Sequence, residues 1–432
     1  MKAEGLIIGA SLLPVAYACS NLLITPGATE DGTSMITYNA DSAALYGQLY
    51  HYPASTNENG TMRKVWDWDT GVYLGEIEEA PETYNVVGNV NEWGLSIGET
   101  TFGGLAELNE GQDAALIDYG SLIWITLQRS KTAREAITVA GQLMATYGYA
   151  SEGESFSIAD PNEVWVMEII GKGKNELGAV WVARKIPDGY VSGHANQARI
   201  TTFPLDSPDE CIYAEDVVTF AQEKGYYPDT AAAEDFSFSD VYDPVTFEGA
   251  RFCEARVWSF FGNITSKAWA DSYEDYALGY NLTNRMPLWV EPTKKLSLED
   301  VQNHMRNHFE NTALTMAEDV GAEGYGSPYR SHPLTWENGG KTYLNERPIG
   351  TQQTGWNFVA QLRSSMPRQF SGILWFGVDD AATTARFPVY GCATSTPKVR
   401  LFPTHFLAPT GAPHVICFYF FIIIIIIIIN LI

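Results

Sequence analysis

The chain has 432 residues, 45% of them hydrophobic and 18% charged, which is typical of a globular protein that can bury a sizeable core. It carries 27 basic and 52 acidic residues, and the resulting formal net charge of −25 repels phosphate backbones and anionic membranes. These values argue against nucleic-acid binding and leave most other classes of function open.

Residues 1–18 have the three parts of a secretory signal. A lysine lies near the start, an apolar stretch covers residues 6–15, and Ala16-Tyr17-Ala18 precedes the expected cleavage point. We therefore expect cleavage immediately before Cys19 and an extracytoplasmic location, secreted or periplasmic. A buried N-terminal strand or helix is the alternative. A lipoprotein signal also remains open, although lipidation would acylate the amine of Cys19.

Five segments have the pattern of β-strands. SNLLIT and MITYN flank a Gly/Pro/Asp-rich turn, so they predict a hairpin with Cys19 at the start of its first strand. A second hairpin is predicted from residues 164–170 and 178–186, and a buried strand over residues 373–378. Strand-forming sequence therefore lies towards both ends of the chain.

Helices are indicated by their capping residues. Thr132 lies three residues before Glu135 in a capping-box pattern, and Ser297 opens a second apolar-periodic segment. A third helix is predicted over residues 213–224, ending at Gly225. Helices between strands favour an α+β fold over a regular βαβ array, and we interpret residues 19–393 as one domain.

The C-terminal segment 394–432 differs from the rest of the chain. Its end reads VICFYFFIIIIIIIINLI, with eight consecutive isoleucines, and is nearly long enough to span a bilayer. A membrane anchor is one interpretation. A homopolymer of one β-branched residue is more typical of an aberrant tail, and we leave this segment out of the fold prediction.

Cys19 is the main candidate for chemistry. The five cysteines are far apart and form no CxxC pair, which gives little support to a zinc site or a dense disulfide framework. Their odd number leaves one thiol unpaired in an exported chain. As an N-terminal residue, Cys19 would supply both a thiol nucleophile and an α-amine that titrates near ~8 and can take the thiol proton. The sequence therefore predicts an N-terminal-nucleophile hydrolase of amide bonds.

Such a site needs a group that orients the amine and donors that stabilise an oxyanion. Asn39 and Asp41 lie two residues apart in a predicted strand and so share one face. Asp41 is the candidate that holds the amine, with Asn39 supporting it. Asn91 and Asn196 are the candidate oxyanion donors, although each alone is more often a turn residue.

Two arginines in the GARFCEARVW segment are further candidates. Arg251 and Arg256 suit the binding of a carboxylate or the ordering of the site, and a buried structural ion pair explains them equally well. Which of the two serves the site stays open at this point.

Rival motifs carry less weight. Residues 94–98 match the G-x-S-x-G nucleophile elbow, but the elbow must lead into a helix and the following residues ETTFGG are poor in helix formers. His304 and His308 have helical spacing, but no HExxH or spaced Cys/His set accompanies them. There is no Walker loop and no GxGxxG, so we expect no metal and no cofactor.

Several blocks of the chain closely resemble the PepD-like cysteine dipeptidases. The resemblance is carried by ACSNLLI, YNADS, ETYNVVGNVNEWGLSIGETTFGG, YASEGESFSIADPNEVWVMEIIGKG, HANQARI, FCEARVWSF, YGSPYR, NERPIGTQQTGWNFVAQLRS and LWFGVDDA. These blocks are collinear and run from Cys19 to about Cys392, which makes them more specific than any single short motif.

The resemblance implies an Ntn-hydrolase fold, a four-layer αββα sandwich of two antiparallel sheets between helices, akin to penicillin V acylase and bile-salt hydrolase. It implies hydrolysis of dipeptides through an acyl-enzyme thioester on Cys19, without a metal. By position, Asp41 matches the residue that holds the amine, and Asn91 lies in the block shared with the wider acylases. Asn196 matches their second amide donor, and Arg251 is the likeliest match to their late arginine.

The chain departs from the family pattern at two places. Tyr38 stands where relatives often have an arginine, so a role for a positive charge at that position is in question. Family members also continue with more sheet and helix where this chain changes after Cys392, so we expect a truncated C-terminal end.

Two other functions stay open. One keeps the fold but takes N-acyl amides such as penicillin V or conjugated bile acids. The other is a non-catalytic surface protein anchored in the membrane by the apolar tail. Dipeptide substrates are the expected partners, and the sequence leaves self-association open.

Overall fold

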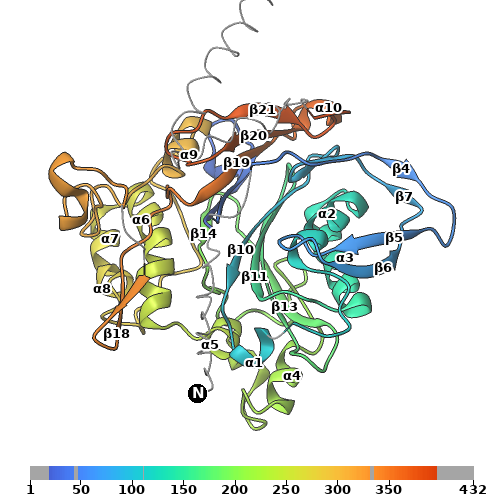
Figure 1. The fold of residues 1–432 in the computed structure, drawn as a ribbon, viewed down its shortest axis with the longest axis horizontal. Coiled ribbons are helices and arrows are strands. Elements are labelled where there is room, and N and C mark those ends of the chain that lie inside the picture. Colours follow the sequence, from blue (N-terminus) through green and yellow to red (C-terminus); the bar gives the residue numbers. More distant parts are fainter. Residues whose placement is uncertain (1–18, 43–46, 110, 331–334, 397–432) are drawn as a thin grey trace, which may run out of the picture. The chain divides into compact units, whose positions relative to one another are not determined.

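A computed structural model describes residues 19–42, 47–109, 111–330 and 335–396 (Figure 1). Almost all of them belong to one compact unit that extends to Thr394. The predicted signal peptide and the isoleucine-rich segment lie outside the described residues. Within those residues, no helix combines the length and apolarity that crossing a membrane requires.

The first large sheet contains both ends of the domain. Its seven strands are all antiparallel and follow the order β16-β14-β1-β2-β19-β20-β21. The hairpin predicted after Cys19 is confirmed, since Leu23 pairs with Ile36, and the strand predicted over 373–378 is β20. The bounds are β1 Asn21–Ile24, β2 Ser34–Asp41, β14 Val191–His194, β16 Trp289–Val290, β19 Thr354–Leu362, β20 Gly372–Val378 and β21 Phe387–Tyr390.

The second large sheet has eight antiparallel strands in the order β15-β13-β12-β11-β10-β9-β8-β3. The hairpin predicted from residues 164–170 and 178–186 is confirmed as β12 and β13, which pair Ile169 with Trp181. The bounds are β3 His51–Tyr52, β8 Val86–Val87, β9 Val90–Asn91, β10 Ser96–Phe102, β11 Gly153–Ala159, β12 Val164–Gly171, β13 Ala179–Lys185 and β15 Cys211–Tyr213.

Three small ribbons complete the strands of the described chain. Strands β4 (Ser55–Thr56) and β7 (Glu82–Thr83) pair with each other, as do β5 (Met62–Trp66) and β6 (Tyr73–Glu78), and β17 (Thr335–Asn338) and β18 (Lys341–Leu344). Figure 1 shows the first two ribbons beyond helices α2 and α3.

Helices lie against the outer side of each large sheet (Figure 1). Helices α2 and α3 contact strands β10, β11 and β13, whereas α6 contacts β14 and α9 contacts β19. The helices are α1 Ala106–Asn109, α2 Tyr119–Arg129, α3 Ala133–Tyr147, α4 Val217–Glu223, α5 Phe238–Tyr242, α6 Ala255–Ile264, α7 Lys267–Ser272, α8 Glu274–Ala277, α9 Leu298–His304 and α10 Arg368–Ser371. Strands in antiparallel sheets combined with packed helices confirm the predicted α+β class.

The predicted capping residues act as expected. The Thr132 side chain accepts a hydrogen bond from the backbone of Glu135, and Ser297 forms a reciprocal capping box with Asp300. The helix predicted over residues 213–224 is shorter than expected. It begins only at Val217, because residues 211–213 pair with β13 as an edge strand instead.

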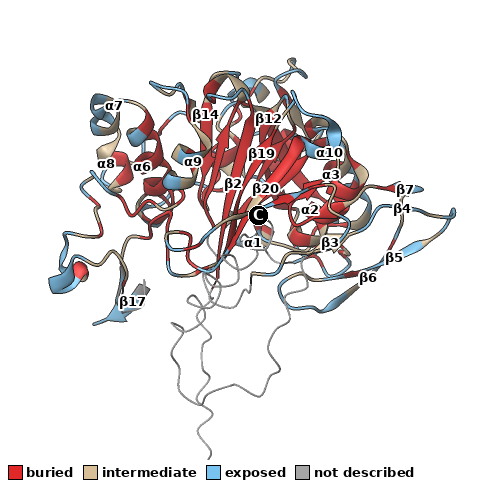
Figure 2. Ribbon diagram, turned by 90° about the horizontal axis from the view of Figure 1, so that it is seen from above, coloured by how far each residue is buried: buried red, intermediate tan, exposed pale blue. Residues whose placement is uncertain are grey.

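The two sheets stack on each other through β2, which contacts β10 and β11. Strand β12 shows why the sequence folds this way. Trp165 and Met167 face the core shared with α2 and α3, whereas Val164 and Val166 face the core between the sheets. A strand with two buried faces needs a nearly continuous apolar run, which the segment VWVMEII supplies with Glu168 as its one charged residue. Figure 2 shows the central strands β2, β12 and β19 as buried.

We expect Trp165→Ala to lower the free energy of unfolding by about 3–5 kcal/mol, because it removes a large, fully buried ring from this strand. Urea denaturation followed by circular dichroism measures the loss. Trp66→Ala is the matched control, because Trp66 is 49% exposed and should cost well under 1 kcal/mol, as surface substitutions usually do. Equal losses in the two variants would contradict the assigned strand faces.

Candidate active site

Cys19 lies directly before strand β1 and is 4% exposed. Its Sγ lies 3.6 Å from Tyr38 Oη on β2 and 3.7 Å from Glu99 Oε1 on β10. The phenol of Tyr38 donates a short hydrogen bond to the same Glu99 oxygen. The thiol is therefore in contact with side chains from both stacked sheets.

The main chain of Cys19 is held by two side chains from distant segments. Its nitrogen donates to Asn196 Oδ1 at 2.9 Å. Arg256 Nη1 donates to the Cys19 carbonyl at 2.7 Å and to Ser20 Oγ at 2.9 Å, and its Nη2 donates to Asn196 Oδ1 at 2.9 Å. Arg256 is fully buried. These bonds fix Cys19 from the nitrogen side and the carbonyl side at once.

Arg256 follows a local irregularity in its helix. Residues 249–254 form a π-helical turn immediately before α6 begins at Ala255. Single π-turns inside helices are rare and frequently occur at functional sites. Burial lowers the pKa of Arg256 to about 10, with Arg347 as the next cause. The guanidinium thus keeps its charge at neutral pH.

Asn196 has a left-handed backbone, with φ of 67°. This conformation costs an L-residue roughly 1–2 kcal/mol, and asparagine tolerates it better than most residues. Its Nδ2 donates to the Thr101 carbonyl at 2.5 Å, which uses one of its two amide hydrogens. Among the described residues, the second amide hydrogen has no hydrogen-bond acceptor.

Asp41 is buried at the end of β2. Its carboxylate accepts a short ion-pair hydrogen bond from Arg347 and one of 2.6 Å from Thr354. Burial raises the pKa of Asp41 to about 6, and the Arg347 charge opposes this rise. Asn39 and Asp41 are predicted to share one face of the strand, and their partners lie close together in the chain. Asn39 Nδ2 donates to the carbonyl of Ile349, which is two residues from Arg347, the partner of Asp41.

Glu99 is one member of a buried carboxylate pair. Burial raises its pKa to about 7, and hydrogen bonds with Glu154 and Cys19 oppose the rise. The pKa of Glu154 is raised well above its ordinary value, first by burial and then by the charge of Glu99. Thr101 Oγ1 donates to Glu154 Oε1 at 2.8 Å. Burial and the mutual repulsion of the two carboxylates therefore both favour a proton on this pair.

The environment holds the Cys19 thiol in its protonated form. Burial raises its pKa well above the ordinary value, and the charges of Glu99 and Asp41 raise it further. A backbone hydrogen bond from Asp41 and the charge of Arg347 act in the opposite direction. Nucleophilic attack by Cys19 therefore requires a base that takes the thiol proton during the reaction.

The structure brings Cys19, Asp41 and Asn196 together, but it places Asn91 and Arg251 elsewhere. Both amide hydrogens of Asn91 are used, since Nδ2 donates to the carbonyls of Leu127 and Ser130 at 2.8 Å each. Arg251 pairs with Glu346, whereas Arg256 reaches Cys19. We correct the expected geometry accordingly: Asn91 ties a turn to the end of α2, and Arg256 takes the place expected of Arg251.

Sequence reasoning did not identify four residues of this cluster as site residues: Tyr38, Glu99, Glu154 and Arg347. Tyr38 was noted only for the arginine it replaces. A usable signal existed for the two glutamates, because each interrupts a strand that is otherwise apolar or small, as in SIGETTF and GESFSIA. A charged residue inside a buried strand requires a specific partner or a function.

The rival motifs do not form a second site. Residues 96–102 continue as strand β10, so the G-x-S-x-G match lacks its helix, as expected from the sequence. Helix α9 ends at His304, and His308 lies beyond it, hydrogen-bonded to Glu310. No group of three or more His, Cys, Asp or Glu residues suited to a metal occurs in the part of the chain that the structure describes.

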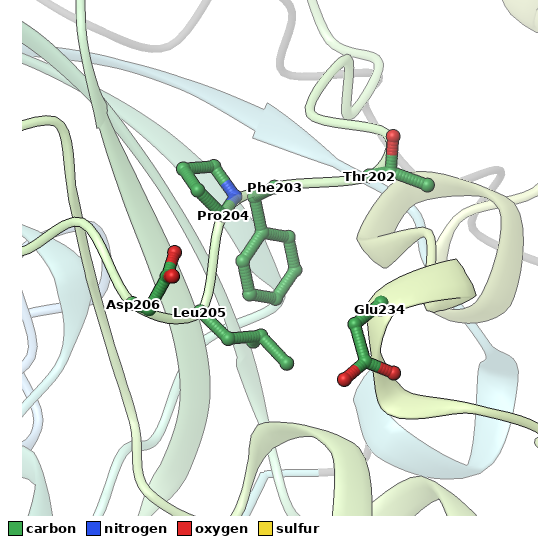
Figure 3. A pocket seen from close by; sticks show the side chains of 6 residues that line it. All are labelled: Thr202, Phe203, Pro204, Leu205, Asp206 and Glu234. Atoms are coloured by element: carbon green, nitrogen blue, oxygen red, sulfur yellow. The ribbon is translucent and has the colours of Figure 1, made fainter.

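A surface pocket occurs away from this cluster (Figure 3). It is lined by apolar side chains and two carboxylates: Thr202, Phe203, Pro204, Leu205, Asp206 and Glu234. None of these residues contacts the Cys19 thiol, and none of them is a strong nucleophile beside a base.

Comparisons with known proteins place the chain in a peptidase family. The family model of Peptidase family C69 matches residues 18–404. A probable dipeptidase of Latilactobacillus sakei is 24% identical over 88% of this chain and 75% of its own length. Dipeptidase A of Lactobacillus helveticus is 22% identical over 88% and 76%, and a probable dipeptidase of Salmonella dublin is 23% identical over 86% and 81%.

The raised pKa of Glu99 makes stability depend on pH. Between its ordinary value of 4.5 and about 7, the unfolded chain has lost a proton that the folded chain keeps, so the contribution of Glu99 to stability falls as pH rises. Because glutamine cannot ionise, we expect Glu99→Gln to gain stability relative to the natural protein between about pH 5 and about pH 8, by roughly 1–3 kcal/mol.

Urea denaturation of both proteins at the two pH values measures this difference. Glu82→Gln is the control, because Glu82 is exposed and the same substitution there should give a difference that does not change with pH. A pH-independent difference for Glu99→Gln would show that Glu99 is ionised throughout.

Proposed function

The chain belongs to Peptidase family C69, and on this premise we propose that it is a secreted cysteine dipeptidase that works through a thioester on Cys19. The relatives named dipeptidases support the reaction, at 22–24% identity. The observation that carries the proposal is the setting of Cys19, whose nitrogen and sulfur both lie in one buried polar cluster.

The proposal includes removal of residues 1–18. Cleavage before Cys19 would turn its main-chain amide into a primary amine on the same residue as the thiol. An α-amine titrates near ~8, whereas a backbone amide is no base at all. The Asn196 amide oxygen, 2.9 Å from this nitrogen, would orient the amine, and the Asp41 carboxylate nearby would stabilise its protonated form.

Acylation would proceed in one addition and one elimination. The amine takes the proton of the Cys19 thiol, and the sulfur attacks the peptide carbonyl carbon. The oxyanion accepts hydrogen bonds from the free amide hydrogen of Asn196 and from backbone donors. The carbon–nitrogen bond then breaks, the ammonium returns its proton to the leaving amine, and the first residue of the dipeptide stays on sulfur as a thioester.

Deacylation would use the same groups in reverse. The amine removes a proton from a water molecule, the resulting hydroxide attacks the thioester carbonyl, and the carbon–sulfur bond breaks. The products are two amino acids and the regenerated thiol. The steps use the thiol and amine of Cys19, the hydrogen-bond donors that surround it, and water.

The family assignment also supports an Ntn-hydrolase sandwich. The stacked antiparallel sheets with helices on their outer sides fit that architecture, and so does a nucleophile at the start of a central strand. An extracytoplasmic location follows from the predicted signal peptide. Both remain parts of the proposal.

We expect Cys19→Ala to lower kcat/KM for dipeptides by about 10⁴-fold or more, because it removes the nucleophile. Cys211→Ala is the matched control, because Cys211 is also buried but lies on the edge strand β15, and it should retain full activity. A panel of dipeptides assayed by amino-acid release gives both values. Turnover by Cys19→Ala at the natural rate would refute the mechanism, and so would an active enzyme whose first residue, by mass spectrometry, is not Cys19.

We expect Asn196→Gly to lower kcat about 10²-fold while leaving the backbone unstrained, because glycine accepts the positive φ that alanine does not. Asn196→Ala should lose the same activity and in addition about 1 kcal/mol of stability. Stopped assays and thermal melts of the two variants separate the side-chain effect from the backbone effect. Full activity in Asn196→Gly would remove this side chain from the mechanism.

A further inference from the structure

The carboxylate pair beside the thiol has no role in the proposed acylation steps. Glu99 lies on β10 and Glu154 on β11, where Thr101 pairs with Glu154. Both side chains are 1% exposed. The other titratable groups whose charges interact with the pair are the phenols of Tyr119 and Tyr149, the thiol of Cys19 and the carboxylate of Glu152.

The pair lacks a cation. Among the described residues, neither Glu99 nor Glu154 forms an ion pair with a lysine, arginine or histidine, and no nitrogen or hydroxyl donor bonds to either Oε2; the two carboxyl groups hydrogen-bond to each other. Two other buried carboxylates of this chain do have such partners, since Asp41 pairs with Arg347 and Glu254 with Arg199. A buried carboxylate without a positive partner costs several kcal/mol when it ionises.

This arrangement also works against the nucleophile. The negative charge of Glu99 disfavours a thiolate at Cys19, which is 3.7 Å away. A cation bound at Glu99 would remove that penalty and favour both ionised groups. A positive charge on a ligand bound at Glu99 would therefore make it easier for the Cys19 thiol to lose its proton.

The distances match one substrate group. In a dipeptide, the amino nitrogen is separated from the scissile carbonyl carbon by only the Cα atom, a span of about 2.5 Å. A substrate whose carbonyl carbon is in contact with Cys19 Sγ therefore carries its α-ammonium within reach of a carboxylate 3.7 Å from that sulfur. An N-acyl amide has no positive charge at this position.

We propose that Glu99, supported by Glu154 and Tyr38, binds the free α-ammonium group of the substrate and so restricts the enzyme to peptides with an unblocked N-terminus. Tyr38 donates to the Oε1 atom of Glu99 and fixes its orientation. Apart from the hydrogen bond that Glu99 shares with Glu154, Glu99 Oε2 has no donor among the described residues, and the ammonium would become its partner. This inference rests on the proposed dipeptidase function and names the substrate group that the same site selects.

The test compares three ligands of equal core structure: L-alanyl-L-alanine, N-acetyl-L-alanyl-L-alanine and propionyl-L-alanine, which lacks only the amine. The natural protein should cleave the first at least about 10²-fold faster in kcat/KM than the other two. Glu99→Gln should lose this preference, mainly through a higher KM for the free dipeptide, because it removes the charge that pairs with the ammonium. Since it also removes a charge that disfavours the Cys19 thiolate, it should not lower the slow rate on propionyl-L-alanine.

Binding to Cys19→Ala provides a readout that needs no turnover. Calorimetry should show that L-alanyl-L-alanine binds Cys19→Ala at least about 30-fold more tightly than it binds the double variant with Glu99→Gln. Propionyl-L-alanine should bind both equally. Loss of catalysis in Cys19→Ala tests the dipeptidase mechanism, whereas this difference in binding tests the ammonium site alone.

Two further variants control for structure. Glu152→Gln removes a charge two residues from Glu154 at an exposed position and should alter no ratio by more than about twofold. Glu154→Gln should weaken the preference for the free amine as Glu99→Gln does, with both melting temperatures recorded. Equal losses on all three ligands in Glu99→Gln, or a natural protein that takes blocked and free substrates alike, would overturn the assignment.

Discussion

The buried guanidinium of Arg256 is the constraint on which the arrangement around Cys19 depends. It donates to the carbonyl of Cys19, to Ser20 Oγ, to the carbonyl of Ala195 and to Asn196 Oδ1. A shorter or neutral side chain would leave several of these buried acceptors without a donor, at about 1–3 kcal/mol each. One charged group therefore couples helix α6, the start of β1 and the turn that carries Asn196.

The cluster around the thiol divides into two electrostatic halves. On one side, Arg256 and Arg347 face the main chain of Cys19 and the Asp41 carboxylate. On the other side, Glu99 contacts the sulfur and hydrogen-bonds to Glu154, and neither carboxylate pairs with a cation among the described residues. Charges buried in a medium of low dielectric interact strongly, so these two halves favour charges of opposite sign. The same division explains why the thiol is protonated at rest and why a base must act on it.

The sequence predicted part of this site and missed another part for identifiable reasons. The N-terminal hairpin, the common face of Asn39 and Asp41 and the position of Cys19 follow from alternation and turn residues over about twenty positions, and the structure confirms them. Arg251 and Arg256 lie five residues apart on one helical segment, so the sequence alone does not show which of them faces Cys19. The π-helical turn at residues 249–254 shifts the phase of that segment, and no local propensity indicates such a turn.

By itself, the sequence determined the α+β class, the two hairpins, two helix caps and the residue that carries the thiol, because each of these depends on neighbours within a few positions. Only the tertiary structure decided which side chains surround that thiol. Tyr38, Glu99, Asn196 and Arg256 come from segments as far as 237 residues from Cys19, and they meet because β2 stacks on β10 while α6 packs on β14. Two sheets stack because each buries a whole apolar face against the other, and each face is made of strands from distant parts of the chain. No single segment of sequence therefore determines which residues meet.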